Sequence, residues 1–193
     1  MNYSMKYNCF HGSTFEAINL ILQTKKFDFE KRNNHWLGNG AYFFIDDEGK
    51  ATWWAQNAVN KEKRENPHKE HNPGVIYIEA NVEKKELINL NIESDQKILS
   101  DFVRVLKENK FEFRFPDNKK LEQKDLEHYV LCQTMDLLSK TKGYKASCYL
   151  FSNEERPHLF KGLAECGIGN NKGNQLCVYD QSILDFETSS QIS

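Results

Sequence analysis

Three short segments, far apart in the chain, carry the interpretation of this sequence: Cys9–Ser13 (CFHGS), Gly38–Phe43 (GNGAYF) and Asn174–Tyr179 (NQLCVY). Each segment places a polar residue or a glycine beside a short apolar run. This pattern is typical of a buried strand that ends at a cleft, where the backbone comes close to a ligand. The three segments therefore predict one ligand site that is assembled from distant strands.

Length and charge exclude several classes of protein. The chain has 193 residues, of which 39% are hydrophobic and 28% charged, and this is the range of one globular domain, expected to span 1–193. Lys and Arg number 26 against 28 Asp and Glu, so the net charge of -2 gives no global field for nucleic acid or an anionic membrane. A local basic patch is still compatible with this balance.

The sequence also favours a cytoplasmic protein without a membrane partner. No apolar run approaches the roughly 20 residues that cross a bilayer, and Met1–Asn8 has neither the basic nor the apolar region of a signal peptide. The five cysteines are widely spaced and odd in number, which predicts reduced thiols and no CxxC pair for zinc. His68 and His71 lack a third ligand nearby, so no metal site is expected.

Hydrophobic periodicity predicts an α+β fold, because strands and helices are mixed without strict alternation. Strands are predicted at 5–10, 41–45, 75–80, 86–90, 146–151 and 175–179. Helices are predicted at 14–26, 49–63, 95–110 and 124–139. Loops are expected at 31–39 and 61–73, a glycine-rich loop at 162–173, and a disordered tail at 188–193.

In order and spacing, the three segments resemble the H-Y-E type of ADP-ribosyltransferase, the group that includes the poly(ADP-ribose) polymerases and small bacterial domains of the same fold. The resemblance implies split antiparallel β-sheets with flanking helices. It rests on about the first 60 and the last 30 residues, and the helical middle, about 93–142, is expected to be an insert.

The resemblance implies NAD as the substrate. His11 would hydrogen-bond a ribose hydroxyl, the Gly12 backbone would pair with the nicotinamide carboxamide, and the rings of Tyr42 and Trp53 would sandwich the nicotinamide, with Trp54 in the core. Aromatic faces suit a pyridinium cation, and a glycine allows close backbone approach. The catalytic residues would be His11, Tyr42 and Gln175. The NAD-binding residues would be His11, Gly12, Ser13, Tyr42, Trp53 and Gln175.

Two departures from the family pattern narrow the chemistry. Where the polymerases have glutamate this chain has Gln175, whose carbonyl can accept a hydrogen bond but cannot act as a general base. Single transfer is then favoured over chain extension, with activation by the acceptor itself or by a loop acid: Glu154, Glu155 or Glu165. The second departure is Lys50, which stands where the polymerases have a serine, and Ser13 or Thr52 would replace that serine.

Three functions remain open at this point. The first is a mono-ADP-ribosyltransferase that modifies protein, RNA or DNA, acting as an intracellular toxin or phage-defence effector, with an antitoxin as a candidate partner. The second is an NAD glycohydrolase or an RNA 2'-phosphotransferase, and the latter is disfavoured because Arg32 is the one arginine near the three segments. The third is an inactive module that binds NAD, ADP-ribose or a partner. Taken singly, His11, Gly38 and Gly40 are more simply structural residues.

Overall fold

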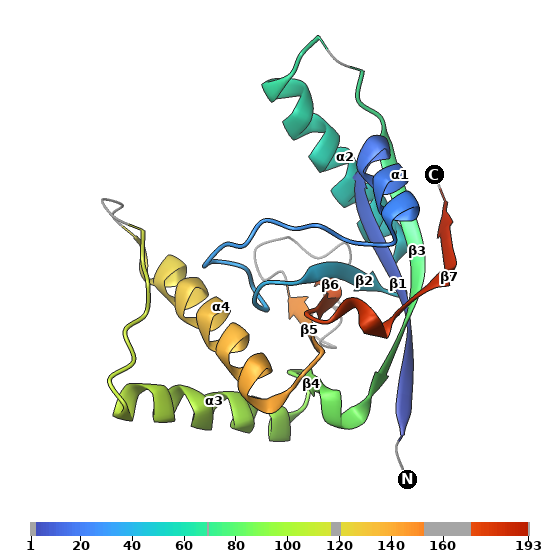
Figure 1. Ribbon diagram of the computed structural model, residues 1–193. Helices are drawn as coiled ribbons and strands as arrows, with labels where there is room; N and C mark the ends of the chain where they lie inside the picture. Colours follow the sequence, from blue (N-terminus) through green and yellow to red (C-terminus); the bar gives the residue numbers. More distant parts are fainter. Residues whose placement is uncertain (1–2, 69, 117–120, 153–170, 193) are drawn as a thin grey trace, which may run out of the picture.

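The computed structural model describes residues 3–192 except 69, 117–120 and 153–170, and within these residues the fold is α+β (Figure 1). The strands are β1 (Ser4–Thr14), β2 (Ala41–Ile45), β3 (Pro73–Glu83), β4 (Leu87–Asn89), β5 (Ala146–Ser152), β6 (Asn171–Val178) and β7 (Leu184–Gln191). The α-helices are α1 (Phe15–Thr24), α2 (Glu48–Glu65), α3 (Glu93–Glu108) and α4 (Gln123–Lys142). Two 3-10 helices, η1 (Lys84–Glu86) and η2 (Gln181–Ile183), precede β4 and β7.

The strands form one mixed sheet in the order β4-β5-β6-β2-β1-β3-β7. The β4–β5 pair is parallel and the other five pairs are antiparallel. The expectation of split antiparallel sheets therefore differs from the observed topology in two respects. The sheet is continuous, and its β4 edge is parallel because the α3–α4 segment connects β4 to β5 as a crossover.

The junction between β1 and β2 is the feature of the sheet that positions the site. These strands are paired at Cys9–Ile45 and Phe10–Phe44, whereas β1 stays paired with β3 as far as Thr14. Beyond Phe10, β1 therefore continues past its pairing with β2. In Figure 1 the β1–β3–β7 part of the sheet diverges from the β2–β6–β5 part at this junction.

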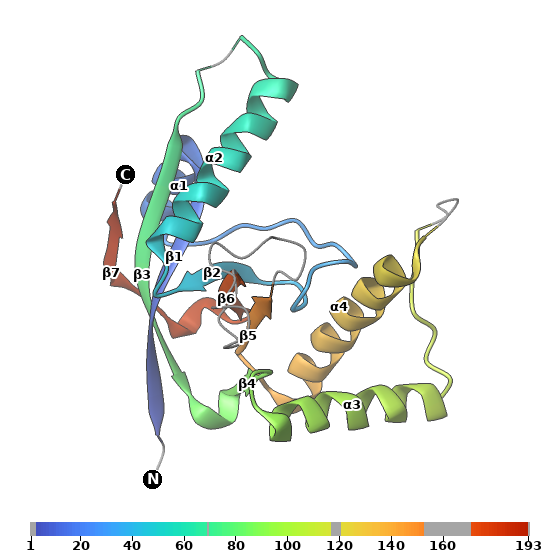
Figure 2. The same ribbon diagram turned by 180° about the vertical axis from the view of Figure 1, so that it is seen from behind.

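Helices α1 and α2 lie on opposite faces of the β1–β3 part of the sheet (Figures 1 and 2). On the α1 side, Ile18 and Ile21 join a core with Cys9, Ile76 and Ile78. On the other side, α2 contributes small residues, of which Ala51, Ala55 and Val59 are fully buried. Small side chains let the helix backbone approach the sheet closely, and this closeness shapes the neighbouring site.

Helices α3 and α4 extend away from the sheet on the side of β4 and β5 (Figure 1). Met135 and Leu138 of α4 are fully buried against Leu37 and Ile88. No residue of α3 is buried. The predicted amphipathic helices at 95–110 and 124–139 are thus confirmed as α3 and α4, within the range expected for the insert.

Two predictions for the last part of the chain are wrong. Residues 188–191 are not a disordered tail but part of β7, which pairs with the edge of β3 at Tyr77–Ser190 and Ile76–Gln191. Residues 171–173, expected in the glycine-rich loop, begin β6. Residues 188–191 lie in an edge strand and residues 171–173 at the start of a strand. Both segments are polar and lack the alternation of apolar residues from which a strand is predicted. The rest of the predicted 162–173 loop lies outside the described residues.

Candidate functional site

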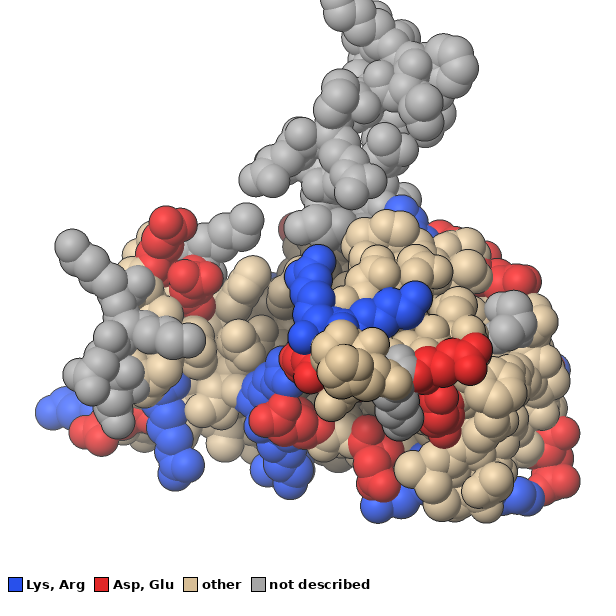
Figure 3. Space-filling model, turned by 90° about the horizontal axis from the view of Figure 1, so that it is seen from above, with Lys and Arg blue, Asp and Glu red and all other residues tan. Residues whose placement is uncertain are grey.

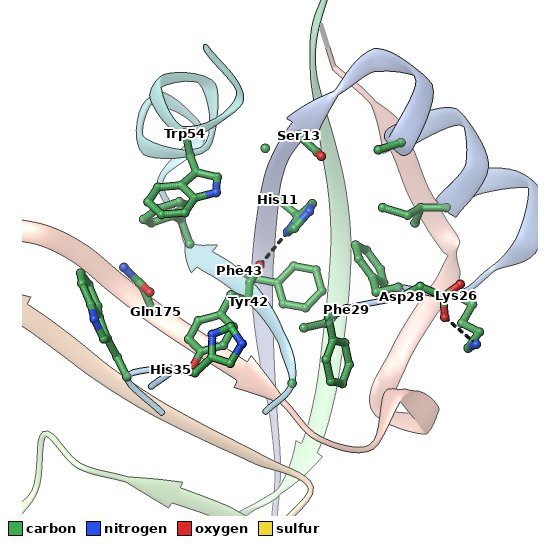
Figure 4. Close-up of a pocket in the computed structure, with 18 of the residues that line it drawn as sticks. His11, Ser13, Lys26, Asp28, Phe29, His35, Tyr42, Phe43, Trp54 and Gln175 are labelled. Atoms are coloured by element: carbon green, nitrogen blue, oxygen red, sulfur yellow. Dashed lines mark hydrogen bonds and ion pairs between the residues drawn. The ribbon is translucent and has the colours of Figure 1, made fainter. Parts of the chain in front are cut away.

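A cavity of about 530 Å³ opens where the two parts of the sheet diverge (Figure 4). It falls within the range of about 300–1,000 Å³ that is typical of small-molecule sites. Residues from all three sequence segments line it: His11, Gly12, Ser13, Tyr42, Phe43 and Gln175. Of the predicted site residues, five lie together in this cavity, and Trp53 does not.

His11 is held in one orientation by the strand beside it. Its Nδ1 lies 2.8 Å from the backbone oxygen of Tyr42, and because a carbonyl only accepts, Nδ1 carries the proton. The ring also packs edge-on against Phe27, with centroids 5.3 Å apart. Burial lowers the pKa of His11, and the hydrogen bond to Tyr42 opposes this only in part. The imidazole is therefore neutral near pH 7, and its Nε2 is an acceptor turned away from the Tyr42 bond (Figure 4).

Tyr42 forms a wall of the cavity, and its hydroxyl is occupied within the protein. The hydroxyl accepts from the backbone N of Leu37 and donates to the oxygen of Gly38, both at 2.8 Å. Burial raises the pKa of Tyr42 well above its usual range. The phenol thus remains neutral and does not transfer protons at the site. Its ring lies 5.7 Å from that of His35, with 33° between the planes, so the aromatic surface is what a ligand meets.

Gln175 sits on β6 between two neighbouring strands, opposite Phe44 on β2 and Tyr149 on β5. Its side chain is only 8% exposed and lines the cavity. A buried amide offers both a donor and an acceptor but no charge. Ser13 lines the cavity as well, whereas the Thr52 hydroxyl donates to the oxygen of Glu48 at 3.0 Å. Of Ser13 and Thr52, Ser13 is the one at the cavity.

The prediction for the two tryptophans is wrong in both parts. Trp54 lines the cavity and Trp53 does not, and neither is in the core, since they are 50% and 53% exposed. The reason lies in the buried face of α2, which is made of Ala51, Ala55 and Val59 and leaves no space for an indole. Successive helix residues point about 100° apart. Trp54 is nearer in rotation to the buried face and is therefore the one that reaches the cavity.

Gly12 is required because α2 packs directly against it. The sequence had suggested another reason, the close approach of a ligand to the backbone. A Cβ at this position would lie 1.9 Å from the oxygen of Ala51 and 2.8 Å from the nitrogen of Ala55. The space that a side chain would need is filled by the backbone of α2. Gly12 also lines the cavity. The same residue therefore leaves space for α2 and has its backbone exposed to the cavity.

Sequence reasoning missed the segment between α1 and β2 as a wall of the cavity. Its lining residues are Lys26, Phe27, Asp28, Phe29, Arg32, Asn34, His35 and Trp36. This segment was predicted in part as a polar loop. Its high density of aromatic side chains was the available signal, because exposed aromatic residues in a loop are unusual unless they bind something.

Helix α4 holds this segment in place through Asn39. The backbone nitrogen and the side-chain Nδ2 of Asn39 both donate to the Asp136 carboxylate at 2.6 Å. The same side chain closes on Arg32, donating to its oxygen at 2.8 Å and accepting from its nitrogen at 2.7 Å. Tyr179, which follows β6, adds a contact of its own, since its hydroxyl donates to the oxygen of Leu37 at 2.5 Å. The α4 helix thus shapes the cavity wall.

The charged groups at the cavity are balanced. Lys26 is paired with Asp28 at 2.5 Å, and Arg32 with Glu30 at 2.6 Å. Figure 3, which views the molecule from above, shows Lys and Arg interspersed with Asp and Glu and no large field of one sign. This agrees with the near-neutral net charge. Recognition at the cavity therefore depends on aromatic surface and a few directed polar groups.

The chain matches no protein-family model, no curated protein and no solved structure. Within the described part of the chain, no helix has the length and apolar character needed to span a membrane. The same residues contain no group of three His, Cys, Asp or Glu arranged to hold a metal ion. His71 is buried and its Nε2 lies 3.0 Å from the oxygen of Asn66. The loop acids Glu154, Glu155 and Glu165 lie outside the described residues.

Proposed function

We propose that this protein is an NAD-dependent mono-ADP-ribosyltransferase that transfers ADP-ribose to a macromolecular acceptor. One observation carries the proposal: His11 is oriented by Tyr42 so that a neutral Nε2 acceptor stands in an aromatic cavity that also contains Gln175. The arrangement suits a ribose hydroxyl at His11 and Gln175, with the nicotinamide against the rings of Tyr42 and Trp54.

The transfer needs little covalent chemistry from the protein. The bond between ribose C1′ and the pyridinium nitrogen breaks, and its electron pair stays on that nitrogen, so neutral nicotinamide leaves. An oxygen or nitrogen of the acceptor forms the new bond to C1′ and releases its proton to water or to a nearby base. Holding both ribose and nicotinamide in place stabilises the positive charge that develops at C1′.

Gln175 supports single transfer over chain extension. Its amide can orient a ribose hydroxyl, but it cannot take a proton from an incoming hydroxyl as a carboxylate does. The acceptor would then supply a good nucleophile of its own, or one of the loop acids Glu154, Glu155 and Glu165 would activate it. We further propose action in the cytoplasm as a toxin or defence effector, with an antitoxin as partner. The four described cysteines, Cys9, Cys132, Cys148 and Cys177, are buried and unpaired, which suits a reducing compartment.

Mass spectrometry of macromolecules from cells that express the wild type or His11→Ala tests the reaction and its target together. The proposal predicts a mass increase of one ADP-ribose unit on protein, RNA or DNA in the wild-type cells alone. Circular dichroism of both proteins controls for folding. The absence of this mass in every fraction, with both proteins folded, contradicts the proposal.

The second candidate function is an inactive module that binds NAD or ADP-ribose, and the neutral Gln175 is what favours it. Calorimetry with NAD, together with a nicotinamide-release assay, separates the two functions. Binding without release supports the module. A gain of release in Gln175→Glu would show that the scaffold positions NAD for cleavage and that the amide alone limits turnover.

A further inference from the structure

A stripe of side chains on α2, exposed except for the half-buried Lys50, begins at the cavity and continues along the helix. Its members recur every three or four residues and therefore share one face. They are Lys50, Trp53, Trp54, Asn57, Asn60, Lys61 and Arg64. None of them is acidic, and the opposite face of the helix is the buried one, made of Ala51, Ala55 and Val59. We call these seven residues the α2 stripe.

The two tryptophans form the end of the α2 stripe next to the cavity. Their ring centroids are 6.1 Å apart, and each side chain is about half exposed, at 53% for Trp53 and 50% for Trp54. Trp54 lines the cavity, and Trp53 lies just outside it. Two adjacent, half-exposed indoles are costly in water unless they meet a planar or apolar group. Trp53 does not line the cavity, so its exposed ring can contact a ligand outside the cavity.

Basic residues form the far end of the α2 stripe. Lys61 and Arg64 follow Trp54 by 7 and 10 residues, about 10 and 15 Å along the axis. The Lys61 side chain is 66% exposed, and its contact with Glu65 is 3.9 Å long, a weak and readily screened pair. In Figures 1 and 2 the C-terminal end of α2 extends past the part of the sheet that it covers, and Lys61 and Arg64 are exposed there.

We infer that the α2 stripe binds the acceptor and that the acceptor is a single-stranded nucleic acid, an inference that rests on the proposed transferase function. A base would stack on Trp53, next to the Trp54 ring that borders the cavity, and phosphates would contact Lys61 and Arg64. Single-strand binders combine aromatic faces with basic groups along a backbone path in this way. Tryptophan and arginine are also common in protein interfaces, but the α2 stripe has no aliphatic residue, and its aromatic end followed by a basic end suits a strand of bases and phosphates.

Fluorescence anisotropy with labelled RNA and DNA strands of about 12 nucleotides tests the inference directly. The wild type is expected to bind one or both strands, and the two arms distinguish RNA from DNA. With two basic residues on phosphates, the logarithm of affinity should fall with the logarithm of salt with a slope of about -1.4. Trp53→Ala should weaken binding about tenfold, and the double variant Lys61→Glu, Arg64→Glu at least as much.

Lys63→Glu is the matched control, because Lys63 is exposed on the same helix but lies outside the α2 stripe. It should bind the strands as the wild type does. Nicotinamide release without acceptor should be unchanged in all four proteins, since none of the substituted residues lines the cavity. That equality also shows that every variant is folded.

The outcomes separate the inference from the proposed function. NAD binding without binding of any strand overturns the inference and leaves the function standing, as does ADP-ribose found on protein alone. Equal weakening by Lys63→Glu also overturns it. Strand binding that depends on Trp53, in a protein that neither binds nor cleaves NAD, supports the α2 stripe as a binding surface and overturns the transferase function.

Discussion

At the scale of the residue, His11 joins the fold to the proposed chemistry. Its Nδ1–H donates to the Tyr42 oxygen at 2.8 Å, so the rest of the ring has one defined role, that of an acceptor. The phenol of Tyr42 is neutral, and its hydroxyl is hydrogen-bonded to the backbone of Leu37 and Gly38. The phenol therefore contributes no proton transfer, and the imidazole contributes an acceptor that orients the ligand.

The lowered pKa of His11 predicts an unusual pH dependence of NAD binding. Protonation turns Nε2 from an acceptor into a donor, and burial delays that change to a pH below the ordinary value of 6.5. Affinity for NAD should therefore be constant from about pH 8 down through pH 6.5 and fall only below it. Calorimetric titrations across this range give the midpoint, and a midpoint above pH 6.5 would contradict the assignment.

The same shift predicts how stability depends on pH. Between pH 6.5 and the lower pKa of His11 in the native protein, the unfolded chain binds the proton and the folded chain does not. Stability from this group should therefore decrease as the pH falls through that window. Urea unfolding of the wild type and His11→Gln at several pH values checks this. The glutamine variant should lose the decrease that His11 causes.

At the scale of the element, the approach of α2 to β1 determines the width of the cavity. Gly12→Ala would place a Cβ 1.9 Å from the Ala51 oxygen, so helix or strand must shift. The expected loss of stability is about 3 kcal/mol or more, together with weaker NAD binding. Urea unfolding measures the first effect and calorimetry the second.

Gly49→Ala is the matched control for this prediction. Gly49 lies in the first turn of α2, and its Cβ would come no nearer than 3.6 Å to Asp47 Oδ1. Alanine is the better helix former, so this variant should be neutral or more stable by up to about 1 kcal/mol. A Gly12→Ala protein as stable as Gly49→Ala would show that α2 does not lie against β1 as described.

The contact between α4 and the cavity wall gives a second prediction at this scale. Asp136→Ala removes both acceptors of Asn39 and should cost about 2–3 kcal/mol in unfolding free energy. Because it frees the segment that carries His35 and Trp36, it should also raise the KM for NAD about tenfold. Enzyme kinetics and urea unfolding measure the two effects.

Asp101→Ala serves as the control, since Asp101 is on α3 and pairs with the exposed Lys97. A solvent-exposed pair contributes little, so this variant should behave as the wild type does in both assays. If Asp136→Ala changes stability but leaves the KM for NAD unchanged, α4 supports the fold without shaping the site.

At the scale of the whole molecule, β7 pairs with β3 and forms one edge of the sheet, and its residues 188–191 had been expected in a disordered tail. A chain that ends after Asp180 loses η2 and β7, and with them the buried Ile183 and Leu184. It should be strongly destabilised or aggregate, because the β3 edge becomes unpaired. A chain that ends after Ile192 keeps every β3–β7 pair and the hydrogen bond from the Ile192 nitrogen to the Val75 oxygen, and it should unfold as the full chain does.

Much of the fold could be predicted because its elements are periodic. The strand at 41–45 and the helices α2, α3 and α4 follow apolar spacing closely. The strand β7 could not be predicted, since its sequence, LDFETSSQ, is polar and owes its conformation to pairing with β3. Local propensity is weak where tertiary pairing decides.

The candidate site was predictable to the extent that it lies in short motifs. His11, Gly12, Ser13, Tyr42 and Gln175 meet at one cavity as their spacing indicated. Trp54 replaced Trp53 because the rotation of α2 is set by Gly12 and Ala51, a contact that sequence periodicity does not reveal. The hydrogen bonds from Asn39 to Asp136 could not be predicted either, since the two residues are 97 positions apart in the chain.

Nicotinamide release from NAD by the purified wild type, beside His11→Ala, tests the central claim most directly. The account predicts measurable release by the wild type and a loss of about 100-fold or more in the variant, with both proteins folded by circular dichroism. Equal release by the two proteins, or no binding and no release of NAD by the wild type, would contradict it.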